Sequence, residues 1–415
     1  MPAPTADPPG PLSVAEALER VLAICDAREP AIERVALESA FGRVLIQDVH
    51  APFDLPPFAN SAMDGFALRG GDLPLEGERA LRLVGTVLAG SPARLACAAG
   101  ECVRITTGAP MPDGADTVVI KENVRVSGGQ VVVGAGERHG ANVRPAGEDH
   151  ARGERVVRAG EELEAARLGA LAACGIAAVD VARRPRVAVF VTGDELVPPA
   201  QALGFGQIHD SNRYTLGALL RATGLEPVRV AHLRDDRGAL RDALLAAAQA
   251  CDVIISSGGV SAGEADFMPG LVAELGRVHF WKVRMRPGMP LLFGGIGPSL
   301  VFGLPGNPVS TVATFLLLVQ PALLALQRAA EPRPRRWKAR LAAPLVKRHA
   351  RAEFLRARLE WRDDGGCWAT PLAKQGSGML RGLVDADALV ALPEEPCEHA
   401  PGHVVDVLPL PRARP

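Results

Sequence analysis

Four short polar segments carry residue types that suit phosphate and metal chemistry. They are TGDEL (192–196), RDD (234–236), SSGGVSAGEAD (256–266) and GLPGNPVS (303–310). Their carboxylates stand at Asp194, Glu195, Asp235, Asp236, Glu264 and Asp266. This many acids would repel a bound anion unless cations sit between them, and acids that face phosphates normally bind Mg²⁺. The segments therefore predict a site where a divalent cation and a phosphorylated ligand bind together.

The same segments hold residues that present backbone N–H groups to an anion. Glycines stand at 258, 259 and 263, where the lack of a side chain lets the backbone approach a ligand closely. Gly306 and Asn307 open a predicted helix whose N-terminus, with Ser310, suits an oxyanion or a phosphate. GGVSAG is neither GxGxxG nor a P-loop, so by itself it is a weak nucleotide motif.

A basic segment, FWKVRMRPGMP (280–290), supplies the balancing positive charge through Lys282, Arg284 and Arg286. Guanidinium forks for oxyanions beside acids for a metal are the set that phosphoryl or adenylyl chemistry uses. Simpler interpretations stay open. Asp235 and Asp236 precede RGALRDALL and could only cap that helix, and a lone lysine is usually a solvated charge. Cys397, His399 and His403 have a conceivable metal spacing, but no fourth ligand lies nearby in the sequence.

The elements that must position these segments form an α/β pattern. Apolar strand candidates are RVAVFV (186–191), PVRVAHL (227–233), DVIISS (252–257) and LVFGL (300–304). Helical stretches follow at 212–223, 237–250, 267–275 and 308–327. Strand–helix alternation with apolar strands predicts a mostly parallel sheet covered on both faces. The polar segments come directly after strands, so they should converge at the carboxyl edge of that sheet.

The regions on either side of this α/β segment have other sequence patterns. Ser13 and Glu16 form a capping box that begins a helix ending before Pro30. Gly128-Gly129 inside VRVSGGQVVV predicts a hairpin, and 163–174 predicts a helix that closes on Gly175. Short strands follow the EPRPRR linker (331–336). We therefore predict an α/β plus β, multidomain fold with a central three-layer α/β domain, a β-rich insert and a small C-terminal β domain.

Composition bounds the class of protein. The 415 residues are 48% hydrophobic and 22% charged, with a net charge of −1. The protein therefore lacks the excess of positive charge that would indicate nucleic-acid binding. Seven scattered cysteines without a Cys-x-x-Cys pair predict thiols in a reducing cytoplasm. The apolar run at 309–326 contains Ser310, Gln320 and Pro321, which favours a buried core helix over a membrane span. The N-terminus lacks the regions of a signal peptide.

One acid stands in an apolar setting. PPFANSAMDGFAL (56–68) places Asp64 among Phe58, Met63 and Phe66. A buried ionised acid is costly unless it is paired. The sequence therefore implies either a partner for this charge or a bound ligand.

Taken together, these motifs resemble the molybdopterin molybdenumtransferases, the MoeA family that includes the gephyrin E domain. The matching stretches are FANSAMDGFAL, RITTGAPMPDGAD, ANVRPAGED, TGDEL, HDSNRYTL, ISSGGVSAGEADF, RPGMP, GLPGNPVS and KQGSGML. They run in the family's order from about residue 13 to 410. NSAMDG and SSGGVSxGEAD are specific, whereas short pieces such as TGDEL are not.

The resemblance implies a domain plan and an assembly. The implied regions are an N-terminal helical and linker region (12–50 and 153–184), a β-rich insert (51–152), an α/β molybdopterin-binding domain (185–329) and a C-terminal β domain (330–415). It also implies a cytoplasmic homodimer whose active cleft lies at the subunit interface, away from membranes.

The resemblance further implies a reaction and its residues. Members hydrolyse adenylylated molybdopterin with Mg²⁺, insert molybdate into the dithiolene and release AMP, and a molybdopterin adenylyltransferase acts upstream. The implied catalytic positions are Asp64, Asp149, Glu195, Asp235, Asp266 and Lys282. Glu195, Asp235 and Asp266 are the implied metal ligands. The implied cofactor-binding positions are Thr107, Ser257, Gly258, Gly259, Asn307, Arg286, Arg356 and Ser377.

One departure bears on the molybdate position. Where many members have KPGKP, this chain has RPGMP, with Arg286 keeping the charge and Met289 removing one. Two alternatives stay open. The adenylyltransferase of the preceding step shares the α/β domain type, but residues 1–184 and 330–415 argue against it. A gephyrin-like scaffold lacks support because no long linker or second catalytic domain is evident.

Overall fold

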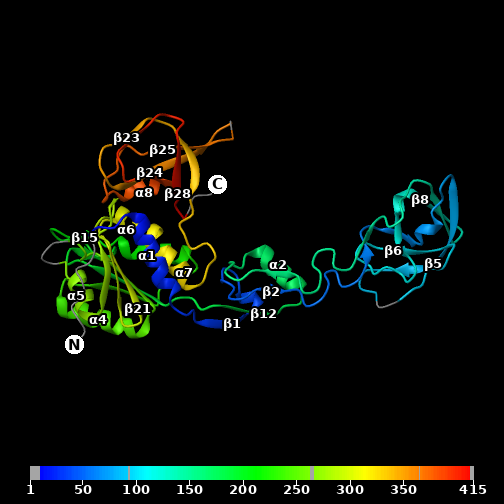
Figure 1. Cartoon of the computed structure of the whole chain (residues 1–415), viewed down its shortest axis with the longest axis horizontal. Coiled ribbons are helices and arrows are strands. Elements are labelled where there is room, and N and C mark those ends of the chain that lie inside the picture. Colours follow the sequence, from blue (N-terminus) through cyan, green and yellow to red (C-terminus); the bar gives the residue numbers. More distant parts are fainter. Residues whose placement is uncertain (1–9, 92–93, 262–265, 364, 412–415) are drawn as a thin grey trace. The chain divides into compact units, whose positions relative to one another are not determined.

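The computed structural model describes residues 10–91, 94–261, 266–363 and 365–411. The chain forms two compact units. The first contains residues 1–33, 42–44 and 182–415, and the second contains 34–41 and 45–181. The predicted four-region division stays a prediction, although each predicted region contributes recognisable elements (Figure 1).

A six-stranded sheet forms the centre of the first unit, in the order β16-β13-β17-β21-β20-β18. Its strands are β13 (Val187–Thr192), β16 (Arg229–Leu233), β17 (Val253–Ser257), β18 (Arg277–Trp281), β20 (Leu292–Ile296) and β21 (Ser299–Leu304). The first four strands in that order pair in parallel, and β20 and β18 add antiparallel. The predicted mostly parallel sheet is confirmed.

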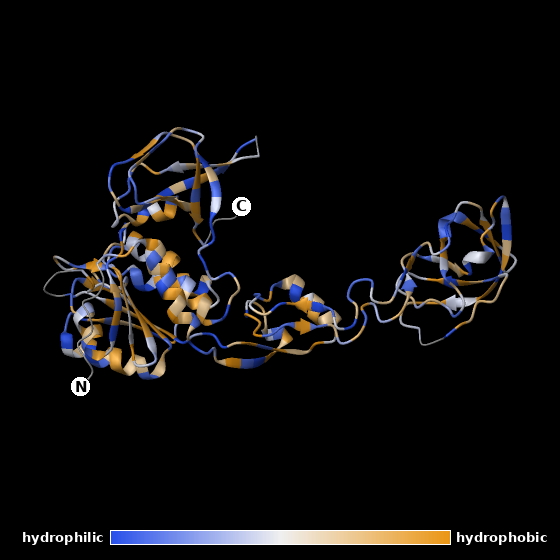
Figure 2. Ribbon diagram, viewed as in Figure 1, coloured by the Kyte–Doolittle hydropathy of each residue, from blue (hydrophilic) through white to orange (hydrophobic). Residues whose placement is uncertain are grey.

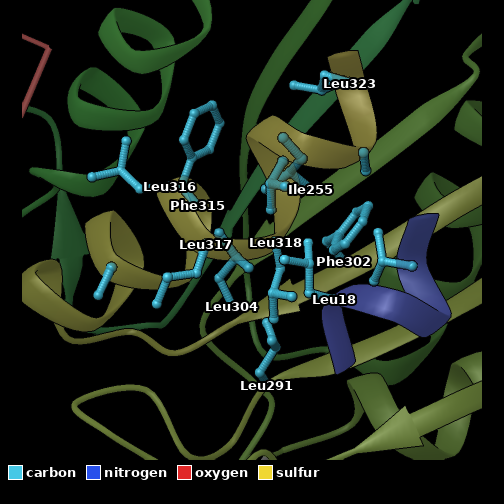
Figure 3. Close-up of a cluster of buried hydrophobic side chains, with 14 of the residues drawn as sticks. Leu18, Ile255, Leu291, Phe302, Leu304, Phe315, Leu316, Leu317, Leu318 and Leu323 are labelled. Carbon is cyan, nitrogen blue, oxygen red and sulfur yellow. The ribbon is translucent and has the colours of Figure 1, made fainter. Parts of the chain in front are cut away.

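Helices cover both faces of this sheet, as the doubly apolar strands predict. One face packs against α1 (Val14–Asp26), α3 (Asn212–Ala222), α6 (Pro308–Thr314) and α7 (Gln320–Leu326), and the other against α4 (Arg237–Ala250) and α5 (Met268–Leu275). Figure 3 shows part of the first core, which includes Leu18, Phe302 and Leu304. Burying such side chains stabilises the fold by about 1.5–3 kcal/mol each.

Local signals fix where two of these helices begin. In α1 the Ser13 hydroxyl accepts from the Glu16 N–H at 3.1 Å, and the Glu16 carboxylate accepts from the Ser13 N–H at 2.7 Å. Helix α4 begins after Asp236, whose carboxylate accepts from the Ala239 N–H at 2.7 Å. Each cap satisfies backbone donors that would otherwise lack partners.

The longest apolar segment, Pro308–Leu326, is long and apolar enough to span a membrane, but 83% of its 18-residue apolar window is buried inside the fold. It continues from α6 through a π-helical turn (Phe315–Val319) into α7. The strands of the central sheet and this segment are largely hydrophobic along their length (Figure 2). The segment is the core helix of the α/β layer, as its position after a buried strand predicts.

A small closed barrel ends the first unit. Its strands are β22 (Trp337–Leu341), β24 (Ala352–Trp361), β25 (Cys367–Pro371), β26 (Ala388–Leu392) and β28 (Val404–Pro409). The order β24-β25-β22-β28-β26 closes because β26 also pairs with β24. A short strand from the α/β segment, β19 (Met285–Arg286), pairs in parallel with β24. The basic RPGMP segment is therefore attached to the barrel.

The second unit holds another six-stranded sheet, in the order β7-β4-β6-β5-β9-β8. These strands are β4 (Gly65–Leu68), β5 (Glu78–Val87), β6 (Glu101–Ile105), β7 (Thr117–Ile120), β8 (Val124–Ser127) and β9 (Gln130–Gly134). The predicted hairpin is β8–β9, with Gly128 and Gly129 at positive φ in its turn. A separate small core forms around α2 (Ala165–Ala173).

Candidate active site

The acidic segments meet at the carboxyl edge of the parallel sheet. The backbone N–H of Asp235, after β16, donates to the carboxylate of Asp194, after β13, at 3.4 Å. Burial raises the pKa of Asp235, and the negative charges of its neighbours raise it further. Those neighbours are Asp194, Glu195 and Asp266. Carboxylates from three loops, far apart in sequence, therefore share one region.

The two consecutive aspartates have different roles. Asp236 caps α4, whereas the neighbouring Asp235 interacts electrostatically with the carboxylates of the other loops. Gly193, at φ +145°, makes room for the Glu195 side chain, because a Cβ at Gly193 would lie 2.5 Å from an oxygen of the Glu195 carboxylate. The capping interpretation is thus correct for one aspartate and wrong for the other.

The acidic region fits a metal that arrives with a phosphorylated ligand. Within the described ranges, no three His, Cys, Asp or Glu side chains already form a group that could hold a metal ion. Mg²⁺ commonly takes only one or two protein carboxylates and completes its shell with water and substrate phosphate oxygens. A cation bound here would also relieve the repulsion that raises the pKa of Asp235. Gly263 and Glu264 lie outside the described residues.

The glycine loop after β17 has a shape that requires glycine. Gly258 has φ +98°, and a Cβ there would lie 2.6 Å from the carbonyl oxygen of Thr192. Gly259 has φ +67°, and its Cβ would lie 3.2 Å from the Thr192 hydroxyl. That hydroxyl is buried and has no hydrogen-bond partner among the residues that the structure describes. The loop is thus pressed against the end of β13, with a buried polar atom left for a further partner.

Two loops distant in sequence meet at the start of α6. The Val309 N–H donates to the carbonyl oxygen of Ser377 at 3.0 Å. A Cβ on Gly378 would lie 3.7 Å from the Asn307 side-chain oxygen. Asn307 is exposed, and no cap hydrogen bond of its side chain is formed. The structure therefore brings Asn307 and Ser377 together.

Arg356 differs from its expected role. The sequence prediction has its guanidinium binding an oxyanion, but the side chain is fully buried, on the face of β24 that also carries Ala352 and Phe354. It donates to the carbonyl oxygens of Lys374, Gly376 and Met379 at 2.8–3.0 Å, and Nε donates to Gln375 at 3.3 Å. Burial lowers its pKa. The guanidinium shapes the loop that carries Ser377, because these carbonyls need its donors.

The other basic candidates are nearer to solvent. The Arg286 side chain is 55% exposed, and its Nε lies 3.5 Å from the Glu353 carboxylate. Lys282 adopts φ +75°, unusual for a non-glycine residue, and its ammonium lies 4.5 Å from the centre of the Trp281 ring. The Trp281 N–H donates to the carbonyl of Val260 at 3.0 Å. Trp281 thus links Lys282 to the glycine loop.

The second unit answers the question raised by Asp64. The side chain is 46% exposed, and its carboxylate accepts from the N–H and the hydroxyl of Thr107, both at 2.9 Å. The Lys121 ammonium lies 3.4 Å away. These contacts, the Thr107 N–H first, lower the pKa of Asp64. Of the two alternatives that the sequence leaves open, a partner within the same unit is present, and binding of a ligand by Asp64 stays a prediction.

The remaining predicted position in this unit, Asp149, is an exposed carboxylate. Its side chain is 66% exposed, with Nδ1 of His150 at 3.4 Å. Sequence reasoning singled out Asp149, Asp64 and Thr107 but missed Lys121 and Trp281. Trp281 could have been noticed because it adjoins Lys282 in FWKVRMRPGMP. Nothing local marks Lys121 as the partner of an acid 57 residues away.

Comparison with known proteins shows which family has this sequence and fold. Residues 12–175 match the MoeA N-terminal region (domain I and II), 188–325 a probable molybdopterin binding domain, and 338–410 the MoeA C-terminal region (domain IV). The chain belongs to the MoeA family. It is an enzyme of molybdenum cofactor biosynthesis by that membership, and its fold matches solved MoeA structures.

Individual relatives align over most of this chain. A molybdopterin molybdenumtransferase of Haemophilus influenzae is 35% identical, covering 91% of this chain and 94% of the relative. A gephyrin of Dictyostelium discoideum is 32% identical, covering 92% of this chain and 60% of that protein. The crystal structure of a molybdopterin biosynthesis MoeA protein from Pyrococcus horikoshii has a TM-score of 0.83 at 29% identity, covering 96% of this chain and 100% of that one.

Proposed function

We propose that this chain hydrolyses adenylylated molybdopterin with Mg²⁺ and transfers molybdate to the dithiolene, releasing AMP. The proposal is carried by the acidic region around Asp235, which lies at the sheet edge where the glycine loop and the Asn307 loop also end. Acids that share one region need a cation, and a phosphoanhydride with bound Mg²⁺ supplies it.

Different residues would bind the metal and the phosphate. Glu195, Asp235 and Asp266 would hold the metal, which when bound withdraws charge from the phosphoryl oxygens. Ionisation of Asp235 becomes easier with a cation beside it, because the raised pKa comes from burial and like charges. The backbone of Gly258 and Gly259 can approach a phosphate closely, since neither residue has a side chain.

Molybdate is a tetrahedral oxyanion and needs several donors. Arg286 offers an exposed guanidinium that is only loosely paired with Glu353. Ser377 offers a hydroxyl on a loop whose carbonyl oxygens accept hydrogen bonds from the buried Arg356. Lys282 adds a positive charge beside the glycine loop through Trp281. In this proposal Arg356 positions Ser377 instead of binding molybdate directly.

The test is AMP release by the purified protein. With adenylylated molybdopterin, Mg²⁺ and molybdate we expect AMP to form, and Glu195→Gln to lower the rate by about 100-fold or more. Glu76→Gln is the matched control, because Glu76 is exposed in the other unit. No stimulation by molybdate, together with wild-type rates for Glu195→Gln, would refute the proposal. Adenylylation of free molybdopterin with ATP would favour the adenylyltransferase instead.

We further propose a homodimer in which the second unit of one subunit completes the site of the other. Phe58 and Met63 are exposed, at 47% and 44%, close in sequence to Asp64, and such apolar exposure beside polar groups is typical of protein interfaces. The test mixes inactive Asp64→Asn subunits with inactive Glu195→Gln subunits. Recovered AMP release supports a shared site, and no recovery in a mixed dimer contradicts it.

The cellular setting is also a proposal. The seven cysteines are free thiols, six of them buried, which fits a reducing compartment, and we propose the cytoplasm. A molybdopterin adenylyltransferase would supply the substrate upstream. Oxidation that forms intramolecular disulfides in protein isolated from cells would argue against this compartment.

A further inference from the structure

Asn212 joins two of the site's loops through one buried side chain. It is the first residue of α3 and is 6% exposed. Its side-chain N–H groups donate to the Ser257 hydroxyl at 2.8 Å and to the Gly306 carbonyl at 2.7 Å. These partners are 45 and 94 residues away along the chain. One carboxamide thus connects the loop after β17 with the loop before α6.

The partners require an amide at this position. The Gly306 carbonyl can only accept, and the Ser257 hydroxyl donates onward to the Pro305 carbonyl at 3.3 Å. Both therefore need a donor, and the amide is the neutral group of this size with two of them. The Asn212 side-chain oxygen is buried and accepts no hydrogen bond from the described part of the chain. Leaving such an acceptor without a hydrogen bond costs free energy of folding. The two hydrogen bonds donated by the amide must therefore contribute more than this cost.

We infer that Asn212 is a positioning residue that fixes the spacing of the Ser257–Gly259 loop and the Gly306–Asn307 loop. The inference rests on the proposed function for the identity of the ligand. A phosphorylated ligand that contacts both loops binds only when their backbone groups stand at the correct separation. Holding them in advance spares the ligand the cost of ordering them. Asn212 itself contacts neither metal nor reacting atoms in this account.

The test compares Asn212→Ala and Asn212→Asp with Ser299→Ala. Asp has the volume of Asn but, when ionised, no donor. Ser299 is a matched control because its fully buried hydroxyl contacts the carbonyls of Ala248 and Cys251, where β21 begins at the opposite edge of the sheet. We expect the KM for adenylylated molybdopterin to rise about tenfold in both Asn212 variants, with kcat changed less than about threefold. The reason is that binding of the substrate and of the transition state weakens equally when the loops are no longer held in place.

Ser299→Ala should lower the melting temperature and leave KM unchanged. Equal KM values for wild type and both Asn212 variants, or an equal rise in Ser299→Ala, would overturn the inference. Hydrogen exchange separates it from the proposed function. Even if the wild type releases no AMP, Asn212→Ala should speed exchange of the Gly258 amide, which donates to Leu304, and unchanged exchange would contradict the inference.

Discussion

Replacing Arg356 by lysine should destabilise the barrel, although the charge is kept. The guanidinium is fully buried, and no carboxylate pairs with it within the described residues. Its donors instead serve the carbonyls of Lys374, Gly376 and Met379. Lysine is shorter in reach and lacks the planar fork, so it cannot serve three carbonyls held at these separate positions.

The magnitude follows from the carbonyls that lose their donors. A buried acceptor left without a partner costs about 1–3 kcal/mol. If the ammonium of lysine keeps one of the three carbonyls, two remain, and the expected loss is about 2–6 kcal/mol of the free energy of unfolding of the barrel. The loop that carries Ser377 should loosen as well, since Gly376 flanks that residue.

The assay is hydrogen exchange of the β24 amides, because a chain of two units need not unfold in one step. Arg358→Lys is the control: it is on the same strand, its side chain is 63% exposed, and it contacts Asp385. We expect the control to change the local free energy of opening by less than about 0.5 kcal/mol. Equal and small effects of Arg356→Lys and Arg358→Lys would refute this account of the buried guanidinium.

Three further predictions concern the acids and the tryptophan. The raised pKa of Asp235 means that its ionised form opposes folding, so Asp235→Asn should raise the melting temperature at pH 7. This gain in melting temperature should shrink as the pH falls through the folded-state pKa of Asp235. Mg²⁺-dependent AMP release should be lost in the same variant. The lowered pKa of Asp64 has the opposite sign, so Asp64→Asn should lower thermal stability at pH 7, and the loss should disappear as the pH falls below 3.8 through the lower folded-state pKa. Trp281→Phe keeps the ring beside Lys282 but removes the N–H to Val260, so KM for adenylylated molybdopterin should rise less in Trp281→Phe than in Trp281→Leu; equal values would contradict the cation–π contact.

Sequence patterns were sufficient where local chemistry decides the structure. The Ser13–Glu16 capping box, the Gly128-Gly129 hairpin and the strand–helix alternation of 186–327 all appear as predicted, because each depends on neighbours within a few residues. The meeting of the acidic loops was also predictable, because parallel strands send their following loops to one edge of the sheet.

Contacts between residues far apart in the chain could not be predicted from the sequence. Asp235 and Asp236 have the same local pattern, and only the position of Asp194, 41 residues away, separates their roles. The Thr107 partner of Asp64 lies 43 residues away in the chain. Burial of Arg356 did leave a signal, since it shares the strand face of the buried Ala352 and Phe354. A charged residue at that position still requires the folded barrel to show which carbonyls it serves.

The most direct test is a crystal of the protein soaked with AMP and Mn²⁺, which substitutes for Mg²⁺ and can be located by its anomalous scattering. The account predicts a Mn²⁺ ion at about 2.0–2.4 Å from the AMP phosphate and from at least one carboxylate among Glu195, Asp235 and Asp266. Mn²⁺ and AMP bound elsewhere, with these three carboxylates facing only solvent, would contradict the account.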